Sequence, residues 1–333
     1  MRVLGASDVR SLVPMSTAVD LMKRVFALHS QGQTISPIRT PVEVPDRSGV
    51  ALFMPAFVAA DEASSASLGA KIVSVFPGNR ERNLPTITAI VLVLDPETGA
   101  PIGMMEGASV TALRTGAVSG AATDLMARPD ASVLTVFGAG AQGVTQAAAV
   151  CSVRDIKEIR VIDPYEPARE SFAARIGEWI DHVPSVNLSL SNAEDALRGA
   201  HIVCTATTSK TPVFEDRWLD AGTHINGVGA FTPEMQEVPD ETVARARIVV
   251  DAVDAILHEA GDIVQPIERG VITTEQIQTE LGQVALGAKQ GRTSSDEITF
   301  FKSVGNAIQD MIVARAAIDA AESSGVGQSV SLD

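Results

Sequence analysis

The apolar residues of the chain follow two different patterns, and the pattern changes near residue 111. Before that point, an amphipathic segment predicts a helix over 7–32, with Ser7 as its N-cap and Gly32 just past its end. Short strand-like runs follow, and the turn signal "DPETG" at 95–99 separates two of them as a hairpin would require. This first block is predicted to be mixed, mostly antiparallel β-structure with a flanking helix.

From residue 111 onward, strands alternate with helices. A small-residue helix is predicted over 111–127, and apolar runs such as "SVLTVF", "EIRVID", "VNLSL", "HIVCTAT", "THINGVG" and "RIVVD" follow with helical segments among them. This alternation is typical of parallel βαβ units. The chain ends in a long amphipathic segment, predicted to be a single helix over 298–325 that packs back on the first block.

Composition narrows the class of protein. A chain of 333 residues is long enough for two domains. Its net charge of −15, without any basic run, argues against a nucleic-acid partner, and the apolar run at 89–94 is too short to cross a membrane. The histidines lack ligand-like spacing, so no metal site is expected. Cys151 and Cys204 lie in apolar contexts and no secretory signal is evident, so we expect buried free thiols and a cytoplasmic location.

The stretch "VFGAGAQG" carries the clearest chemical signal. Gly138, Gly140 and Gly143 follow an apolar strand over 133–137 and open an alanine-rich helix. In this G-x-G-x-x-G pattern the first glycine permits a tight turn and the second lets a pyrophosphate approach the backbone. The third lets helix and strand pack closely, while the helix N-terminus offers free N–H groups. The stretch predicts a dinucleotide-binding domain.

Asp163 supports this prediction and indicates which dinucleotide binds. It ends the strand "EIRVID", twenty residues after Gly143, where a carboxylate would bind the ribose 2′-hydroxyl. The same carboxylate would repel a 2′-phosphate, so NAD(H) is favoured over NADP(H), although Arg169 lies nearby.

Three cationic residues of the first block lie in apolar or small-residue stretches: Arg39, Lys71 and Arg114. Lys71 belongs to the buried-strand pattern "AKIVSVF", so it requires an anionic partner. If the three side chains meet in one cleft, they would hold a carboxylate; otherwise they are solvated surface side chains.

Several motifs occur in the order seen in a known family. The run "GASVTALRTGAVSGAATDLMARPDASVLTVFGAGAQG", with "FMPAF", "GAKIVSVFPGN", "LPTITAIVLVLDPETG" and "FFKSVGNAIQD", resembles the ornithine cyclodeaminase/mu-crystallin family. The resemblance covers nearly the whole chain. It implies an α/β fold in which a Rossmann NAD-binding domain, 116–307, is flanked by a mixed, mostly antiparallel α+β domain formed by 1–115 and 308–333. That second domain would bind substrate and form a homodimer.

The resemblance also implies roles for individual residues. Substrate carboxylate binding would fall to Arg39, Lys71 and Arg114, and Val304 would reach the active site. The cofactor-binding residues would be Thr86, Arg114, Gly138, Ala139, Gly140, Ala141, Gln142, Asp163, Thr205, Thr207, Val228, Gly229 and Ser303.

Two positions depart from the family's cyclodeaminases. Phe231 stands where those enzymes carry an aspartate after "VG", and Leu52 where they carry a glutamate before "MP". A hydrophobic pair can neither take a proton nor bind an ammonium group. The motifs "VGAF" and "TPEMQE" are closer to the family's imine (ketimine) reductases, which add hydride to a C=N bond beside a carboxylate. We therefore expect an NAD(P)H-dependent imine reductase or L-amino-acid dehydrogenase; the alternatives are a cyclodeaminase-type lyase with bound NAD+ and a mu-crystallin-like ligand-binding protein.

The sequence does not decide between two main candidate substrates. A cyclic ketimine such as pyrroline-2-carboxylate would gain an apolar wall from Leu52 and Phe231. Iminosuccinate, giving aspartate, would need another cation, which Arg80 or Arg82 could supply unless these are solvated loop residues; iminopyruvate, giving alanine, is a third candidate. In each case Lys71 is the predicted catalytic residue, which would either keep the imine nitrogen protonated or supply the proton.

Overall fold

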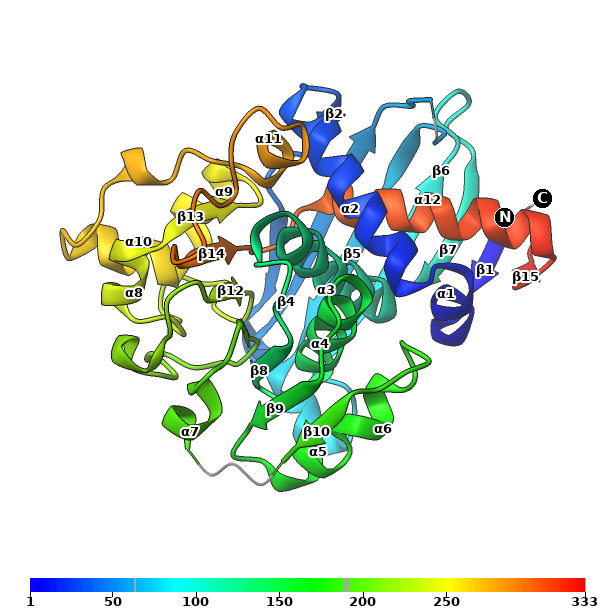
Figure 1. Cartoon of the computed structure of the whole chain (residues 1–333). Helices are drawn as coiled ribbons and strands as arrows, with labels where there is room; N and C mark the ends of the chain where they lie inside the picture. Colours follow the sequence, from blue (N-terminus) through cyan, green and yellow to red (C-terminus); the bar gives the residue numbers. More distant parts are fainter. Residues whose placement is uncertain (63, 189–191, 333) are drawn as a thin grey trace. The chain divides into compact units, whose positions relative to one another are not determined.

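The structure is a computed structural model that describes residues 1–62, 64–188 and 192–332 (Figure 1). It divides into two compact units. Unit 1 comprises Met1–Leu21, Leu28–Arg114 and Asn306–Asp333, and unit 2 comprises Met22–Ala27 and Thr115–Gly305. These divisions lie within two residues of the predicted domain limits, apart from the short segment Met22–Ala27.

Unit 1 is built on one eight-stranded sheet, with the strand order β15-β1-β7-β6-β5-β4-β2 and with β3 paired to β4. Its middle is antiparallel from β4 to β7, whereas β1 pairs with β7 in parallel, so the predicted mixed, mostly antiparallel block is confirmed. The strands are β1 (Arg2–Leu4), β2 (Thr34–Ile35), β3 (Thr40–Val44), β4 (Gly49–Val58), β5 (Ser67–Val75), β6 (Ile87–Leu94), β7 (Pro101–Glu106) and β15 (Gln328–Ser329).

The two faces of this sheet differ. Helix α12 (Ala307–Ser324) packs across β4 to β7. The face with Met54 and Val91 is buried, and Lys71 shares it because it is their cross-strand neighbour. On the opposite face, Phe53 and Ile90 remain 40% and 44% exposed.

Two predicted helices are wrong in extent. The segment 7–32 forms α1 (Ala6–Leu12) and α2 (Met15–Ser30), which are separated at Pro14. The N-cap is Gly5 rather than Ser7, because the Asp8 carboxylate accepts the Gly5 N–H. The predicted helix over 298–325 begins instead as strand β14 (Thr299–Lys302), whose β-branched and aromatic residues favour a strand, and α12 starts only after the N-cap Asn306.

Unit 2 contains a seven-stranded parallel sheet in the order β10-β9-β8-β11-β12-β14-β13, which confirms the Rossmann prediction. The strand order reverses between β8 and β11, the place where such sheets bind ligands. Its strands are β8 (Val133–Phe137), β9 (Glu158–Ile162), β10 (Ser185–Asn187), β11 (Ile202–Thr205), β12 (His224–Gly227), β13 (Arg247–Val250) and β14. Residues 189–191, which include the end of the predicted strand "VNLSL", lie outside the described ranges.

Helices connect these strands, and α3 (Gly107–Met126) continues from unit 1 into unit 2. The others in unit 2 are α4 (Ala141–Val153), α5 (Glu166–Glu170), α6 (Phe172–Ile176), α7 (Ala193–Leu197), α8 (Asp240–Arg245), α9 (Val253–Glu259), α10 (Gly261–Glu268) and α11 (Leu281–Ala285). Short 3-10 turns are η1 (Pro45–Arg47), η2 (Pro77–Arg82), η3 (Asp216–Trp218) and η4 (Thr274–Gln276). Within the described ranges, no helix combines the length and apolarity needed to span a membrane.

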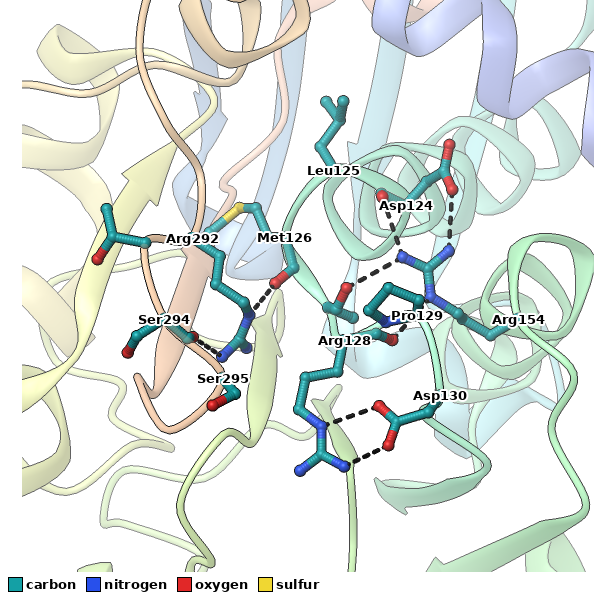
Figure 2. Close-up of a pocket in the computed structure, with 12 residues that line it drawn as sticks. Asp124, Leu125, Met126, Arg128, Pro129, Asp130, Arg154, Arg292, Ser294 and Ser295 are labelled. Carbon is teal, nitrogen blue, oxygen red and sulfur yellow. Dashed lines mark hydrogen bonds and ion pairs between the residues drawn. The ribbon is translucent and has the colours of Figure 1, made fainter.

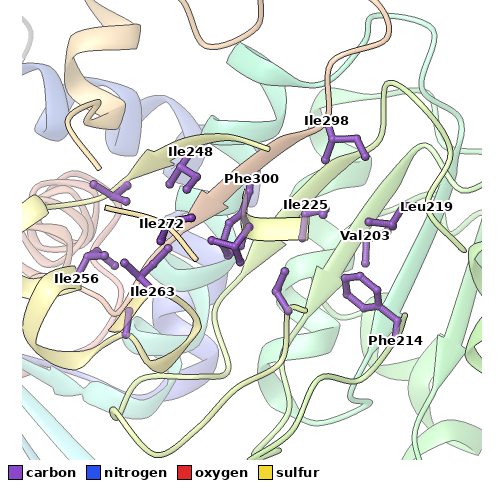
Figure 3. Close-up of a cluster of buried hydrophobic side chains, with 14 of the residues drawn as sticks. Val203, Phe214, Leu219, Ile225, Ile248, Ile256, Ile263, Ile272, Ile298 and Phe300 are labelled. Atoms are coloured by element: carbon purple, nitrogen blue, oxygen red, sulfur yellow. The ribbon is translucent and has the colours of Figure 1, made fainter. Parts of the chain in front are cut away.

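Alternation along the strands gives unit 2 a hydrophobic core on each face of its sheet. On β11, Val203 joins a cluster with Phe214, Ile225 and Phe300, which Figure 3 shows. Its neighbours Ile202 and Cys204 belong to a second cluster with α4 and α6 residues. Because both faces of the sheet are buried, a ligand can bind only at the ends of the strands, where the loops emerge.

Candidate active site

A buried ionic cluster in unit 1 surrounds Lys71. Its Nζ lies 2.8 Å from Oδ2 of Asp310, and Oδ1 of Asp310 lies 3.3 Å from Nε of Arg114. Lys71 is 2% exposed, Arg114 6% and Asp310 0%. The anionic partner that the buried lysine requires is therefore Asp310, which sequence reasoning did not single out.

The start of α12 fixes this cluster. The Nη1 group of Arg114 donates to Oε1 of Gln309 at 2.9 Å, and the same oxygen accepts the N–H of Asn306, the residue that caps the helix. The Thr111 hydroxyl lies 3.5 Å from Lys71 Nζ. Strand β5 and helices α3 and α12 thus each contribute to one site.

Burial lowers the pKa of Lys71 to about 8; Asp310 opposes this shift, whereas the positive charges of Arg114 and Arg39 reinforce it. Arg39 thus lies within electrostatic range of Lys71, and its part in one common site stays a prediction. Lys71 and Arg114 share the single carboxylate of Asp310, so this buried pair carries more positive charge than Asp310 offsets, which suits an anionic ligand. An ammonium group with this pKa can also exchange a proton near neutral pH.

The glycine turn of unit 2 has the form that a dinucleotide needs. Gly138 has φ +98°, a left-handed conformation that disfavours side chains, and a Cβ at Gly143 would overlap the Gly138 carbonyl oxygen. Among the described residues, a Cβ at Gly140 would meet no atom within 4 Å, and no side chain caps α4, which begins at Ala141. The open space and the uncapped helix N-terminus fit a pyrophosphate.

Two side chains complete this turn. The Asp163 carboxylate accepts the N–H of Ala139 at 2.6 Å and that of Tyr165 at 2.8 Å, so it is fixed at the end of β9 with lone pairs left for a ribose. Within the described part of the chain, the Gln142 side-chain oxygen is buried without a hydrogen-bond partner. The residues of this turn therefore fit NAD(H).

The remaining predicted cofactor residues of unit 2 follow other strands of the sheet. The hydroxyl of Thr205, which is fully buried, and that of Thr207 donate to Glu237, as does the Gly229 N–H. The Thr205 hydroxyl is therefore bound to Glu237, and the predicted contact of Thr205 with the cofactor stays a prediction. Val228 is 9% exposed.

Asp251 holds the segment that follows β14. Its carboxylate accepts the Ser303 hydroxyl at 2.7 Å and the Val304 N–H at 3.0 Å. Sequence reasoning gave neither Glu237 nor Asp251 a role. Glu237 ends the motif "TPEMQE", and Asp251 directly follows the apolar strand "RIVV"; these positions are the signals that could have found them.

Three predicted substrate residues, Arg80, Arg82 and Phe231, and the predicted cofactor residue Thr86 are more exposed than the ionic cluster. Arg80 and Arg82 lie exposed on η2, directly after the strand that carries Lys71, and Thr86 is half-buried just before β6. In unit 2, Phe231 is 50% exposed in the loop after β12. Their roles stay predictions.

A pocket lies at the amino edge of the unit 2 sheet, before β8 and β14 (Figure 2). The arginines that line it form hydrogen bonds or ion pairs with other groups of the protein. Arg154 donates to carbonyls at the end of α3, Arg292 donates to the Met126 carbonyl, and Arg128 pairs with Asp130. Arg154 and Arg292 thus stabilise the end of α3, and the pocket lies at the end of the sheet opposite the glycine turn, so we do not assign the active site to it.

Known proteins resemble this chain in sequence and in fold. Residues 1–325 match the ornithine cyclodeaminase/mu-crystallin family. A Δ1-pyrroline-2-carboxylate reductase from Bacillus cereus is 39% identical over 99% of both chains. The structure of the Thermococcus litoralis enzyme of that name, in complex with NADH and L-proline, is similar with a TM-score of 0.91 at 38% identity, covering 99% of this chain and 100% of that one. An archaeal alanine dehydrogenase dimer with bound NAD has a TM-score of 0.90 at 34% identity, covering 100% and 99%.

Proposed function

The chain belongs to the ornithine cyclodeaminase/mu-crystallin family, and from that premise we propose that it reduces the C=N bond of a small imino acid, giving an L-amino acid. The observation that carries this proposal is the buried Lys71 ammonium, which shares the Asp310 carboxylate with Arg114; burial lowers its pKa to about 8, so it can donate a proton. Full-length relatives that act as reductases and dehydrogenases support the same reaction class.

The preferred substrate is the cyclic ketimine pyrroline-2-carboxylate. Leu52 lies on the same sheet face as Lys71, since it is two residues from Met54, which pairs with Lys71. It presents an apolar side chain where a diamino acid would need a carboxylate. Iminosuccinate is the second candidate, favoured by the position of Arg80 and Arg82 directly after β5.

When bound, NADH supplies the hydride. The chain's own residues do the rest: Arg114 and Arg39 bind the substrate carboxylate and so orient the imine carbon. Lys71 donates the proton that the imine nitrogen gains and is reprotonated from solvent, while the Asp310 charge keeps it in the ammonium form.

The test is an NADH-consumption screen. Pyrroline-2-carboxylate, piperideine-2-carboxylate, pyruvate with ammonia and oxaloacetate with ammonia are offered in parallel, each with NADH and with NADPH. We expect stoichiometric NADH oxidation, fastest with pyrroline-2-carboxylate, and weaker use of NADPH because of Asp163. Conversion of ornithine to proline without net NADH oxidation would establish a lyase instead, and ligand binding without turnover a binding protein.

We also propose that the protein is a cytoplasmic homodimer. Cross-strand neighbours on the uncovered face of the unit 1 sheet, which include Phe53, Ile72 and Ile90, form an apolar surface that a second copy would cover. The thiols of Cys151 and Cys204, whose pKa values burial raises to about 12, suit a reducing compartment that supplies NADH.

A further inference from the structure

Glu237 is a fully buried carboxylate in unit 2 that joins two separate loops. Its Oε1 accepts the N–H and the hydroxyl of Thr207 at 2.6 and 2.8 Å. Its Oε2 accepts the N–H groups of Gly229 and Ala230 at 2.8 and 3.0 Å, and the Thr205 hydroxyl at 3.0 Å. One side chain therefore holds the loop after β11 and the loop after β12.

These loops lie beside the place where the cofactor is expected. Both follow the carboxyl ends of parallel strands, and β11 neighbours β8 where the strand order reverses. The Ala206 N–H donates to the Phe137 carbonyl at 2.8 Å, next to the glycine turn. Glu237 thus lies directly behind the loops that face the turn across the crevice.

Glu237 is itself held by a second buried carboxylate. Oδ1 of Asp262 accepts the N–H groups of Glu237 and Val238 at 2.6 and 3.0 Å, and Oδ2 pairs with Lys302 Nζ at 2.7 Å. Lys302 and Asp262 have no exposed side-chain surface. Because Lys302 belongs to β14, which pairs with β12, the whole arrangement is fixed to the sheet.

Stability alone does not account for this arrangement. Burying two carboxylates with one ammonium is costly, and apolar side chains of similar size usually stabilise a core as well. Burial and the charge of Asp262 raise the pKa of Glu237 above its ordinary value, and Lys302 and Thr207 oppose this rise. The backbone N–H groups around the carboxylate can only donate, so they favour its ionised form. A Cβ at Gly229 would overlap both Glu237 Oε1 and the Thr207 backbone. The loop after β12 therefore packs directly against the loop after β11 and against the Glu237 carboxylate.

We propose that Glu237 is a positioning residue whose carboxylate holds the loops 205–207 and 228–230 in the conformation that accepts the nicotinamide end of NADH. It touches the loops and acts through them. The inference rests on the proposed function only in requiring that NADH binds, and it is independent of which imine is reduced.

The test is Glu237→Gln in the full chain, which keeps the side-chain size but removes the charge and one acceptor. Two quantities are measured: hydrogen exchange of the Thr207, Gly229 and Ala230 amides without cofactor, and NADH affinity by fluorescence titration. We expect exchange to quicken and the Kd for NADH to rise about tenfold, as loss of one charged hydrogen bond implies. Glu297→Gln is the control, because the Glu297 carboxylate accepts the Thr293 N–H at the amino edge of the same sheet and should affect neither quantity.

Faster exchange with unchanged NADH affinity would overturn the inference, and so would unchanged exchange. If Glu237→Gln does not fold, Thr205→Val removes a single buried donor and must change both quantities in the same direction, to a smaller extent; unchanged NADH affinity there overturns the inference too. Since titration needs no imine, a chain that binds NADH normally but reduces no imine would refute the proposed function and leave this inference standing.

Discussion

The ion pair between Lys71 and Asp310 should set the pH above which kcat/KM falls. Imine reduction needs Lys71 in the ammonium form, and its pKa is about 8, so kcat/KM should fall as pH rises above that value. Asp310→Asn keeps the side-chain size and removes the charge that raises this pKa. The basic limb of the pH profile should therefore move to lower pH.

The magnitude follows from the burial of the pair. An opposite charge within ion-pair distance shifts a pKa by about 1–3 units, or about 1.4–4 kcal/mol. Solvent screening offsets little of this, because the side chains of Lys71 and Asp310 are only 2% and 0% exposed. We expect the basic limb of Asp310→Asn about 1–3 pH units below that of the wild type.

The assay is kcat/KM for NADH-dependent reduction of pyrroline-2-carboxylate across the pH range in which the enzyme is folded. Asp319→Asn is the control, because Asp319 lies on the same helix but pairs with Arg315 and is 42% exposed. The ionisation of the imine itself is identical in all three proteins, so only a difference between the profiles counts. A basic limb of Asp310→Asn that coincides with the wild type, or moves upward, would refute the proton-donor role of Lys71.

Three further outcomes are expected. Asp163→Ala should raise the ratio of kcat/KM for NADPH to that for NADH, because it removes the carboxylate that would face a 2′-phosphate; an unchanged ratio would place that contact elsewhere. Phe53→Asp should convert a dimer to monomers in sedimentation, since it puts a charge on the uncovered apolar face; an unaltered dimer would require another interface. Burial lowers the pKa of His224 to about 3, so the unfolded chain binds more protons below pH 6.5, and the free energy of unfolding should fall by about 2 kcal/mol between pH 6.5 and 5. His224→Gln should flatten that slope in urea titrations, and an equal slope would mean that other groups cause it.

The features that could be predicted from the sequence involve residues that are close together along the chain. The glycine turn and Asp163 are separated by one helix and one strand, so spacing alone identified them. Asp310 is different: it lies 196 residues from Arg114, and only folding brings the two together. The buried lysine showed that an anion was needed but not which one. Glu237 was equally hidden, since its partners lie in two other loops.

The wrong helix limits have a related cause. In both predicted helices, 7–32 and 298–325, the apolar pattern continues across a position where the helix is interrupted or has not yet begun. Single residues mark these positions. Pro14 separates α1 from α2, and Asn306 with Gln309 forms the capping box that starts α12. Backbone chemistry at these positions outweighs the side-chain periodicity around them.

The distribution of charge explains how an acidic protein can bind anionic ligands. A net charge of −15 repels anions at long range, but salt screens such interactions beyond about 8–10 Å. Near the sites, the carboxylates of Asp163, Glu237 and Asp251 each accept at least two backbone N–H groups, so the protein stabilises their negative charge locally. Asp310 is likewise paired with Lys71 and Arg114, and Arg39 adds a further positive charge to that cluster. The carboxylates thus fix the loops and the lysine. The charge of Lys71 and Arg114 in excess of Asp310 can then attract the substrate carboxylate, and the N-terminus of α4 the pyrophosphate.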